Sequence, residues 1–384
     1  MTTGDVAFFT SQLDCILATI KSLVSHESPS DDAAAVHSSA ANLAELGARL
    51  LGVEPERIAE DKCTHLRWHL GNGSRRVLLL GHHDTVWPIG TLQRIPFEVN
   101  DGILRGPGCF DMKAGVAMML HAVAALPNAD GVTILITGDE EVGSPSSREL
   151  IEFEALAHNA VLVLEASADR GAVKTARKGV SQYSITVHGR ASHAGLAPEH
   201  GINSTVELAH QVLAIASLAD EAHGTTVTPT VAESGTTANT VPASAAVEVD
   251  VRAWTASEQL RVDEQLRALK PAVAGAQVEV DGGVNRLPME HGSSQRLFGM
   301  GASLASGLGL PPLEAAAVGG ASDGNFTAAL GIATLDGLGA IGGGAHSEDE
   351  HVVVSSLPGR TALLHALVAA LLLHREDAGG DDHG

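Results

Sequence analysis

The sequence has few aromatic and few basic residues, and both shortages exclude classes of protein. Phe, Trp and Tyr make up 3% of the 384 residues, and 24 Lys and Arg residues stand against 46 Asp and Glu residues, giving a formal charge of −22. Association with a nucleic-acid backbone or an anionic membrane depends mainly on Lys and Arg. We therefore expect neither a nucleic acid nor a membrane among the partners of this protein.

Cysteine and long hydrophobic runs are also scarce. The three cysteines, Cys15, Cys63 and Cys109, are far apart and cannot all pair, which favours a reducing compartment over a disulfide-stabilised fold. The N-terminus lacks the basic flank of a signal peptide. The richest apolar stretch, residues 361–373, is interrupted by His365 and is expected to be too short to cross a bilayer. We expect a soluble, cytoplasmic protein.

Apolar residues, in contrast, are abundant and regularly spaced. They make up 44% of the chain, enough for a sizeable core and for two or three domains. Helical spacing predicts helices over residues 8–24, 33–51 and 114–126. Short uncharged runs predict four buried strands, over residues 77–80, 132–136, 160–164 and 332–335. This pattern predicts an α/β domain with a mixed sheet flanked by helices.

The middle of the chain shows a second pattern, in which strands and helices follow the order βαββαβ. The expected strands are residues 181–187, 226–232, 246–251 and 276–280, and the expected helices are 202–218 and 257–269. Four antiparallel strands backed by two helices form a ferredoxin-like unit. We therefore expect an inserted domain at residues 180–288 within a discontinuous domain of residues 1–179 and 289–375. The acidic tail, residues 376–384, is expected to be disordered.

Residues that can bind a metal follow each of the four predicted buried strands, where ligand sites of open α/β sheets lie. They are His82, His83 and Asp84 after the first strand, Asp139, Glu140 and Glu141 after the second, Glu165 after the third, and His346 beyond the fourth. Asp111, in a glycine-rich turn before a predicted helix, can point at the same edge, although an acid there also suits the helix dipole. Imidazole and carboxylate ligands suit zinc, and two zinc ions bridged by one carboxylate can act together in a hydrolysis.

The spacing within two of these segments predicts different roles for neighbouring residues. In His82-x-Asp84 both side chains point the same way from an extended segment, so Asp84 can hold the second imidazole N–H. The adjacent side chains of Glu140 and Glu141 diverge, so one can bind metal while the other takes a proton from water. The spacing by itself leaves open which glutamate does which.

Nine segments together resemble a known enzyme family in their order and spacing. They are GHHDTVWP, GPGCFDMKAG, TGDEEVGS, LVLE, ASHAG, NTVPAS, VDVRA, GGASDG and GGGAHSEDE. Across residues 15–370 the chain resembles the co-catalytic zinc exopeptidases and deacylases that include glutamate carboxypeptidase, acetylornithine deacetylase and succinyl-diaminopimelate desuccinylase. The resemblance implies two zinc ions per subunit, with Co²⁺ or Mn²⁺ as substitutes.

The resemblance also implies a role for each candidate residue. Asp111 bridges the two ions, and Glu140 is the general base. The other metal ligands form two pairs, His82 with Glu165 and Glu141 with His346. The inserted domain is implied to form a homodimer and to act as a lid, with His193 reaching the partner subunit's active site to polarise the scissile carbonyl.

The substrate-binding residues implied by the resemblance are Asn239 and Arg252, and a guanidinium suits bidentate binding of a carboxylate. Arg286 is a further candidate, although Leu287 stands where the family often has proline, and Arg177 and Lys178 are additional basic residues near the domain junction. The likeness is closest to glutamate carboxypeptidases. We therefore expect hydrolysis, through a metal-bridging water, of an amide bond next to a C-terminal, glutamate-like amino acid in a small peptide or N-acyl amino acid. The alternative is an N-acyl amino acid deacylase of the acetylornithine or succinyl-diaminopimelate type.

Two short motifs favour other functions. Residues 337–342, GLGAIG, fit a dinucleotide-binding fingerprint, but no amphipathic helix is predicted to start at the third glycine. Residues 320–324, GASDG, fit a nucleophile elbow, which would make a metal-independent serine hydrolase with Ser322 as nucleophile and His346 as base. The serine-hydrolase hypothesis gives no role to His82, Asp111, Glu140, Glu141 or Glu165. A catalytically silent binding protein is disfavoured by the presence of Glu140.

Overall fold

The structure, a computed structural model, describes residues 4–60 and 62–373. The chain divides into two units. Unit 1 lies within residues 1–175, 291–317 and 322–384, and unit 2 comprises residues 176–290 and 318–321. The expected insert, residues 180–288, lies within unit 2, whereas the expected disordered tail, residues 376–384, lies outside the described residues.

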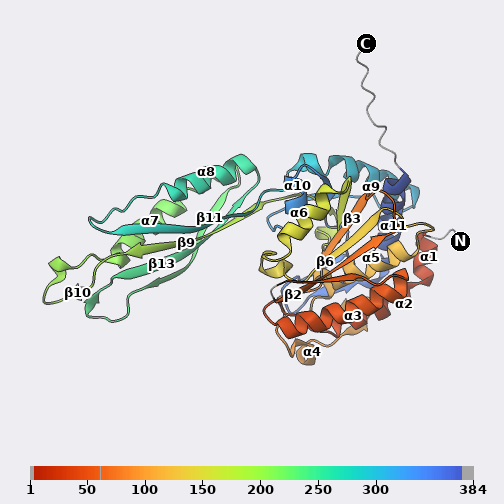
Figure 1. Cartoon of the computed structure of the whole chain (residues 1–384), viewed down its shortest axis with the longest axis horizontal. Helices are drawn as coiled ribbons and strands as arrows, with labels where there is room; N and C mark the ends of the chain where they lie inside the picture. The colour runs from red at the N-terminus through yellow and green to blue at the C-terminus, as the bar shows by residue number, and fades with distance from the viewer. Residues whose placement is uncertain (1–3, 61, 374–384) are drawn as a thin grey trace, which may run out of the picture. The chain divides into compact units, whose positions relative to one another are not determined.

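Unit 1 is built on a six-stranded mixed sheet (Figure 1). In spatial order its strands are β1 (Glu56–Glu60), β2 (Cys63–Leu70), β6 (Val132–Thr137), β3 (Val77–His82), β7 (Ala160–Val163) and β16 (Ala333–Leu335). The pairs β1–β2 and β2–β6 are antiparallel, and β6, β3, β7 and β16 run parallel. The four strands predicted from uncharged apolar runs therefore form the parallel part of the sheet. This confirms the predicted α/β class.

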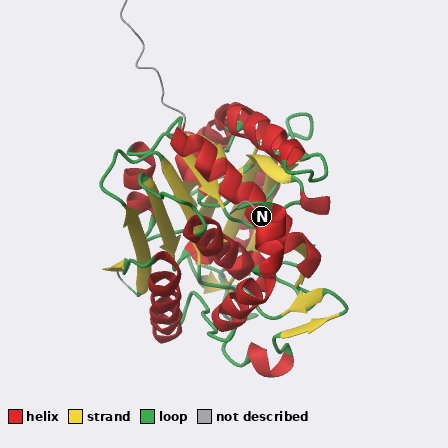
Figure 2. Ribbon diagram, turned by 90° about the vertical axis from the view of Figure 1, so that its right-hand side faces the viewer, coloured by secondary structure: helices red, strands yellow, loops and turns green. Residues whose placement is uncertain are grey.

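Helices cover both faces of this sheet, which is why its central strands are apolar on both sides (Figures 1 and 2). Leu78 and Leu80 of β3 pack in a cluster with residues of α6 and α10, whereas Val77 and Leu79 join the larger core on the other face. The helices of unit 1 are α1 (Val6–Ser11), α2 (Leu13–Val24), α3 (Ala33–Leu51), α4 (Thr91–Arg94), α5 (Ala114–Ala124), α6 (Arg148–Leu156), α9 (Gln295–Gly307), α10 (Gly324–Ala329) and α11 (Leu357–Leu373).

Of the two helices predicted near the N-terminus, one has the predicted bounds and the other is divided into two. Helix α3 has the expected bounds because the Asp32 carboxylate caps its start and Gly52, at φ +73°, ends it. The single helix expected over residues 8–24 is instead α1 and α2, separated at Gln12. The hydroxyls of Thr10 and Ser11 donate to backbone carbonyls of α1, a contact that competes with continuous helix.

Helix α11 corrects the expectation about the C-terminal apolar stretch. The helical segment Val354–Leu373 has 20 residues and is, among the described residues, the one helix long and apolar enough to cross a membrane. However, 61% of its most apolar window is buried within the fold, and Nδ1 of His365 donates a hydrogen bond to the Ala122 carbonyl, 3.0 Å away. A buried core helix passes the same length and composition test, so this segment is weak evidence for a membrane span.

Unit 2 has the predicted element order βαββαβ. Its elements are β9 (Gly179–His188), α7 (Ser204–Ala216), β11 (Thr226–Ser234), β13 (Ser244–Ala253), α8 (Ala256–Arg267) and β14 (Gln277–Arg286). The four strands form an antiparallel sheet in the order β11-β13-β9-β14, the arrangement of a ferredoxin-like unit. Tyr183, Ile185 and Val187 of β9 point into a core shared with both helices.

Smaller strands complete the described chain. A four-stranded sheet has the order β17 (Gly342–Gly343), β18 (His351–Val353), β5 (Ile103–Arg105) and β4 (Glu98–Asn100). Two-stranded sheets pair β10 (Ser192–His193) with β12 (Thr240–Val241), and β8 (Val173–Arg177) with β15 (Ala315–Val318).

Candidate metal centre

The parallel strands of unit 1 bring most of the candidate ligands to one edge of the sheet. His82 is the last residue of β3 and pairs with Thr137 at the end of β6, so the residues after β6 continue beside it. Glu165 follows β7, the other neighbour of β3. Asp111 lies in the turn Cys109–Lys113 (η1) before α5, and His346 in the loop between β17 and β18.

The bridging carboxylate implied by the sequence has the required contacts. One oxygen of Asp111, Oδ1, lies 3.4 Å from His82 Nε2, and the other, Oδ2, lies 3.4 Å from His346 Nε2. His82 Nε2 also lies 3.5 Å from Glu165 Oε1, and His346 Nε2 lies 3.2 Å from Glu141 Oε2. The two pairs of residues named by the resemblance therefore stand on opposite sides of Asp111, each with one imidazole and one further carboxylate.

Three buried atoms of this cluster indicate that a metal fits between these residues. His82 Nε2, Asp111 Oδ1 and Glu141 Oε1 have no hydrogen-bond partner among the described residues. Because buried polar atoms are almost always hydrogen-bonded, three unsatisfied atoms within one cluster need a ligand outside the chain. An imidazole nitrogen and carboxylate oxygens are suitable ligands for a zinc ion.

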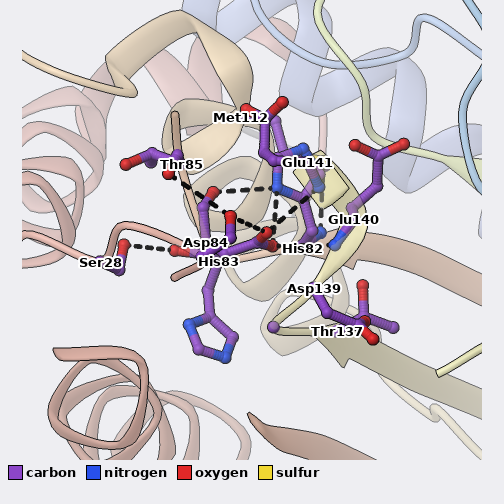
Figure 3. A network of polar contacts seen from close by, with 12 residues as sticks. Ser28, His82, His83, Asp84, Thr85, Met112, Thr137, Asp139, Glu140 and Glu141 are labelled. Carbon is purple, nitrogen blue, oxygen red and sulfur yellow. Dashed lines mark hydrogen bonds and ion pairs between the residues drawn. The ribbon is translucent and has the colours of Figure 1, made fainter. Parts of the chain in front are cut away.

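The two adjacent glutamates contribute to different parts of the cluster. Ligand atoms of His82, Asp111 and Glu141 lie within 4.8 Å of one another, and so do those of His82, Glu140 and Glu165. The Asp84 carboxylate holds the backbone of both glutamates, accepting the N–H of Glu140 at 3.2 Å and that of Glu141 at 3.1 Å (Figure 3). A third donor to Asp84, the Ser30 hydroxyl at 2.7 Å, completes this arrangement.

The structure therefore modifies the role expected for Asp84. His82 Nδ1 lies 3.0 Å from the Asp84 backbone oxygen and 3.4 Å from the carboxylate, so the backbone oxygen is the closer acceptor of the imidazole N–H. Either contact sets the tautomer in which Nε2 faces Asp111. The Asp84 carboxylate also binds the backbone N–H groups of Glu140 and Glu141 and so positions both residues.

Two candidates that neighbour the ligands in sequence point elsewhere. The ring of His83 points away from His82 and the glutamates (Figure 3) and contacts the Thr64 carbonyl and the Ser39 hydroxyl. Burial lowers the pKa of His83 to about 4, so this imidazole is neutral. Asp139 accepts hydrogen bonds from the backbone and hydroxyl groups of Ser146 and Ser147, which holds the loop after β6.

Without metal, the charges of the cluster compensate one another. Burial by itself lowers the pKa of His82, but Asp111, Asp84 and Glu165 outweigh that effect and raise it well above its usual value. Asp111 and Glu141 raise the pKa of His346 to about 10. Burial would raise the pKa of Asp111, yet the two imidazoles hold it well below its usual range, whereas burial dominates at Glu141 and raises its pKa. The metal-free site thus pairs protonated imidazoles with a shared carboxylate.

Comparisons with known proteins identify the family of this chain. Residues 78–370 match the peptidase family M20/M25/M40. The chain belongs to this family. It is a metal-dependent hydrolase of peptide or linear amide bonds, as its relatives are, and the resemblance identified from nine segments is confirmed.

Relatives within the M20/M25/M40 family include both a carboxypeptidase and a deacylase. The chain is 29% identical to carboxypeptidase G2 of Pseudomonas sp. (strain RS-16) over 381 residues, which covers 94% of this chain and 90% of that protein. It is 28% identical to succinyl-diaminopimelate desuccinylase of Ectopseudomonas mendocina over 346 residues, covering 84% and 90%. An M20-family metallo-carboxypeptidase from Sulfolobus solfataricus shares the fold, with a TM-score of 0.70 at 16% identity, over 94% of this chain and 99% of that one.

A further cluster of metal-ligand residue types lies in unit 2 of this M20/M25/M40 chain. Ligand atoms of Asp220, His223 and Glu258 lie within 4.8 Å of one another. His223 and Asp220 already form an ion pair at 2.8 Å, and the Arg261 guanidinium donates twice to Glu258. Because a cation already neutralises Glu258, this partly exposed cluster is better explained as an ion-pair network.

His193 and Asn239, two substrate-site candidates, lie side by side in unit 2. Residue His193 of β10 pairs with Thr240 of β12, and the Ala194 N–H donates to the Asn239 carbonyl at 2.9 Å. Nδ1 of His193 accepts the backbone N–H groups of Gly195 and Leu196, both at 3.1 Å. Nε2 of a neutral His193 ring therefore carries the proton and can donate it from an exposed side chain.

The basic candidates Arg252 and Arg286 lie on a different sheet of unit 2, the four-stranded one. Arg252 of β13 and Arg286 of β14 both pair with Val180 of β9, eight residues along the strand from His188, or roughly 26 Å at 3.3 Å per residue. Arg252 makes a two-pronged ion pair with Asp250, which accepts from Nε and Nη2 at 2.8 Å. Arg286 is buried.

Arg177 and Lys178 are held by backbone carbonyls. Arg177 Nη1 donates to the Gly320 carbonyl at 3.0 Å. Lys178 Nζ donates to the Gly224 carbonyl, and its ammonium lies 5.2 Å from the centre of the Trp254 ring. Burial and the neighbouring Arg252 lower the pKa of Lys178.

The structure does not support the two competing motifs. The Ser322 hydroxyl is fully buried and donates to Asp336 at 2.6 Å, and His346 faces Asp111 and Glu141 instead of the serine. Residues 337–342 end in the short strand β17, and no helix starts there in the described chain. The two segments match the sequence patterns, but their structure, described in full, fits neither a nucleophile elbow nor a dinucleotide-binding loop.

One residue beside the ligands was not singled out from the sequence. Glu350 lies four residues after His346, is 1% exposed, and accepts hydrogen bonds from the turn that carries Asp111. Burial raises its pKa, although the N–H donors of Asp111, Gly108 and Phe110 act in the opposite direction. It is the last residue of the quoted segment GGGAHSEDE, where the acidic run gives no sign of which carboxylate is buried.

Proposed function

We propose that this M20/M25/M40 chain is a carboxypeptidase that uses two zinc ions to release a C-terminal, glutamate-like amino acid from a small peptide or N-acyl amino acid. The observation that carries the proposal is Asp111, which presents one carboxylate oxygen to each of two imidazoles. Similarity to carboxypeptidase G2 across 94% of the chain supports the carboxypeptidase assignment.

In this proposal one ion is held by His82 and Glu165, the other by Glu141 and His346, and Asp111 is shared. When bound, the ions lower the pKa of the attacking water and stabilise negative charge on the carbonyl oxygen. Co²⁺ or Mn²⁺ would be accepted by the same nitrogen and oxygen ligands.

The chain supplies the proton transfers. Glu140 is within 4.8 Å of ligand atoms of both His82 and Glu165, so its carboxylate can take the proton of the attacking water and deliver it to the leaving amine. We assign His193 as the donor that polarises the scissile carbonyl, since its Nδ1 already accepts two backbone N–H groups and Nε2 carries the proton. It would act from the second subunit of a homodimer formed through unit 2, with unit 2 as the lid.

Substrate binding is assigned to Arg252, with Asn239 and Arg286 as further contacts. Because Nε and Nη2 of Arg252 already donate to Asp250, Nη1 is the group that remains for a substrate carboxylate.

We also propose a cytoplasmic location. No disulfide joins the three cysteines, all of which lie in the described chain.

The alternative is an N-acyl amino acid deacylase, favoured by the 28% identity to succinyl-diaminopimelate desuccinylase. The two functions differ in which part of the substrate the enzyme selects. A carboxypeptidase of this kind requires the α-carboxylate of the released residue, whereas a desuccinylase also selects the acyl group.

Hydrolysis of paired substrates by the metal-loaded enzyme tests the proposal. We expect turnover of an N-acyl-L-glutamate, loss of turnover for its α-carboxamide, loss after chelation, and about two zinc ions per chain by elemental analysis. Faster turnover of N-succinyl-diaminopimelate or acetylornithine would select the deacylase. Full activity after complete removal of metal would overturn both.

A further inference from the structure

Both oxygens of the buried Glu350 carboxylate accept hydrogen bonds, two at each oxygen. Oε1 accepts the backbone N–H groups of Phe110 at 2.8 Å and of Asp111 at 3.1 Å. Oε2 accepts the N–H of Gly108 at 2.9 Å and the indole N–H of Trp87 at 2.7 Å. All four partners are donors, so this position requires a group that accepts hydrogen bonds on both of its terminal atoms.

These four donors belong to two of the segments that carry proposed metal ligands, and Glu350 itself belongs to a third. Trp87 follows His82 in the loop after β3, and Gly108, Phe110 and Asp111 form the turn with the bridging carboxylate. Glu350 ends the loop that carries His346. One carboxylate thus connects the backbone around Asp111 with the loops of both imidazoles.

The His346 loop depends on this connection more than the His82 segment does. The His346 side chain is 50% exposed, and its backbone has φ +61°, in the left-handed region. The loop consists of two successive turns. The Ser347 N–H donates to the Gly344 carbonyl in the first, and the Glu350 N–H donates to the Ser347 carbonyl in the second, each at 2.9 Å. His82, in contrast, is buried at the end of β3 and held by Asp84. Glu350 is the point at which the exposed loop returns to the interior.

We propose that Glu350 is a positioning residue that aligns the bridging Asp111 with His346, so that the ion held by His346 and Glu141 depends on it. The inference rests on the two-metal centre proposed above and deepens it. Without the Glu350 carboxylate, three backbone N–H groups and one indole N–H lose their acceptor, and the Asp111 turn and the His346 loop are no longer joined. The ion on the other side keeps His82 and Glu165, which Glu350 does not contact, whereas the second ion loses the alignment of both Asp111 and His346.

The test compares Glu350→Gln with a matched variant in the same loop, Glu348→Gln. Glutamine keeps the size of the side chain but presents an amide N–H₂ to two of the four donors. Glu348 is an exposed residue whose carboxylate forms an ion pair with Arg94 at 2.8 Å, so its substitution removes the same charge from the same loop without touching Asp111. Zinc per chain is measured by elemental analysis after dialysis against graded chelator, and the absorption spectrum is recorded after Co²⁺ substitution.

We expect the wild type and Glu348→Gln to retain two ions over the same chelator range. Glu350→Gln should retain one ion, with the affinity for the second lower by about 10–100-fold, the usual effect of removing a group that orients metal ligands. The Co²⁺ spectrum should lose the contribution of one site. Trp87→Phe, which removes one of the four donors but keeps a ring, should weaken the second ion by a smaller factor.

The failures are distinguishable. Two equally tight ions in Glu350→Gln would overturn the role of Glu350 and leave the proposed function intact, whereas a wild type that binds no metal would overturn the proposed function itself. If Glu350→Gln does not fold, Trp87→Phe decides the question, and an unchanged second-ion affinity in that variant would overturn the inference.

Discussion

At the scale of single residues, the two imidazoles proposed as metal ligands, His82 and His346, carry protons that a metal ion would have to displace. The carboxylates of Asp111 and Glu141 raise the pKa of His346 to about 10. Three carboxylates, those of Asp111, Asp84 and Glu165, raise the pKa of His82. A metal binds only the neutral imidazole. The carboxylates that would bind the metal also stabilise the protonated imidazoles, so protons compete with the metal for His82 and His346.

Zinc binding should release protons at neutral pH. Since His346 titrates near 10 without metal, raising the pH toward that value removes the competing proton, and apparent zinc affinity should increase between about pH 6 and pH 9. Isothermal titration calorimetry at pH 7.5 in two buffers with different ionisation enthalpies measures the release. Identical heats in both buffers would contradict the metal-free charge state described here.

Glu140 should be required for turnover but not for metal binding. In Glu140→Gln the amide cannot accept the proton of the attacking water, so kcat should fall by at least ~100-fold, the usual contribution of a general base. Elemental analysis should still give the zinc content of the wild type, because the proposed ligands are unchanged.

A suitable control is Glu149→Gln, an exposed glutamate in the first turn of α6. We expect wild-type kcat for this variant. A Glu140→Gln enzyme with wild-type kcat would assign the base to another residue, and one that lost zinc as well would place Glu140 among the ligands.

At the scale of elements, the site depends on the close approach of α5 to the segment after β7. A Cβ added at Gly115 of α5 would lie 2.1 Å from the carbonyl oxygen of Leu164, the residue before Glu165. This contact explains why a glycine occupies the second position of α5, where alanine is otherwise the better helix former. The glycine lets the helix that follows Asp111 pack directly on the backbone that precedes Glu165.

Two glycine substitutions should therefore have opposite effects. Gly115→Ala should lower the free energy of unfolding by ~1–3 kcal/mol, because the Leu164 backbone has to move. Gly299→Ala, in α9 with nothing within 4 Å of the added Cβ, should raise it by up to ~1 kcal/mol. Urea denaturation of both variants measures the difference, and equal effects would mean that the close approach at Gly115 has no energetic consequence.

At the scale of the whole molecule, unit 2 has features that fit an interface with a second chain. β11 is an edge strand, and Val231 on it is 58% exposed. Leu213 of α7 is 72% exposed, and Val206 of the same helix is also exposed. Unpaired strand edges and exposed apolar side chains are usually covered in a functional assembly.

The proposed homodimer predicts a mass of twice one chain in solution. The double variant Leu213→Asp, Val231→Lys should be a monomer by size-exclusion chromatography with light scattering, since charges replace apolar contact. It should keep its zinc but lose activity by at least ~100-fold, the cost of removing a donor to the carbonyl oxygen, because His193 would come from the partner subunit.

The matched control is Phe153→Asp, a 63% exposed residue of α6 in unit 1. We expect this variant to stay dimeric and active. A wild-type monomer with full turnover would overturn both the dimer and the role of His193 across it.

The sequence by itself determined the α/β class, the four buried strands, the βαββαβ order of unit 2 and the candidate ligands. These features are local: a buried strand is an uncharged apolar run, and the candidate ligands follow the strands whose ends form the proposed site. Family membership was also readable, because it rests on nine short segments in a fixed order.

Only the tertiary structure showed which polar residues converge on Asp111 and which ones hold the backbone around it. Asp139 and His83 belong to the same segments as Glu140 and His82 but face Ser147 and Thr64 instead. Glu350 meets Asp111 across 239 residues of chain. Such contacts depend on where distant loops meet after folding. For Asp139 and Glu350, the residue type alone does not distinguish a metal ligand from a carboxylate that accepts backbone N–H groups.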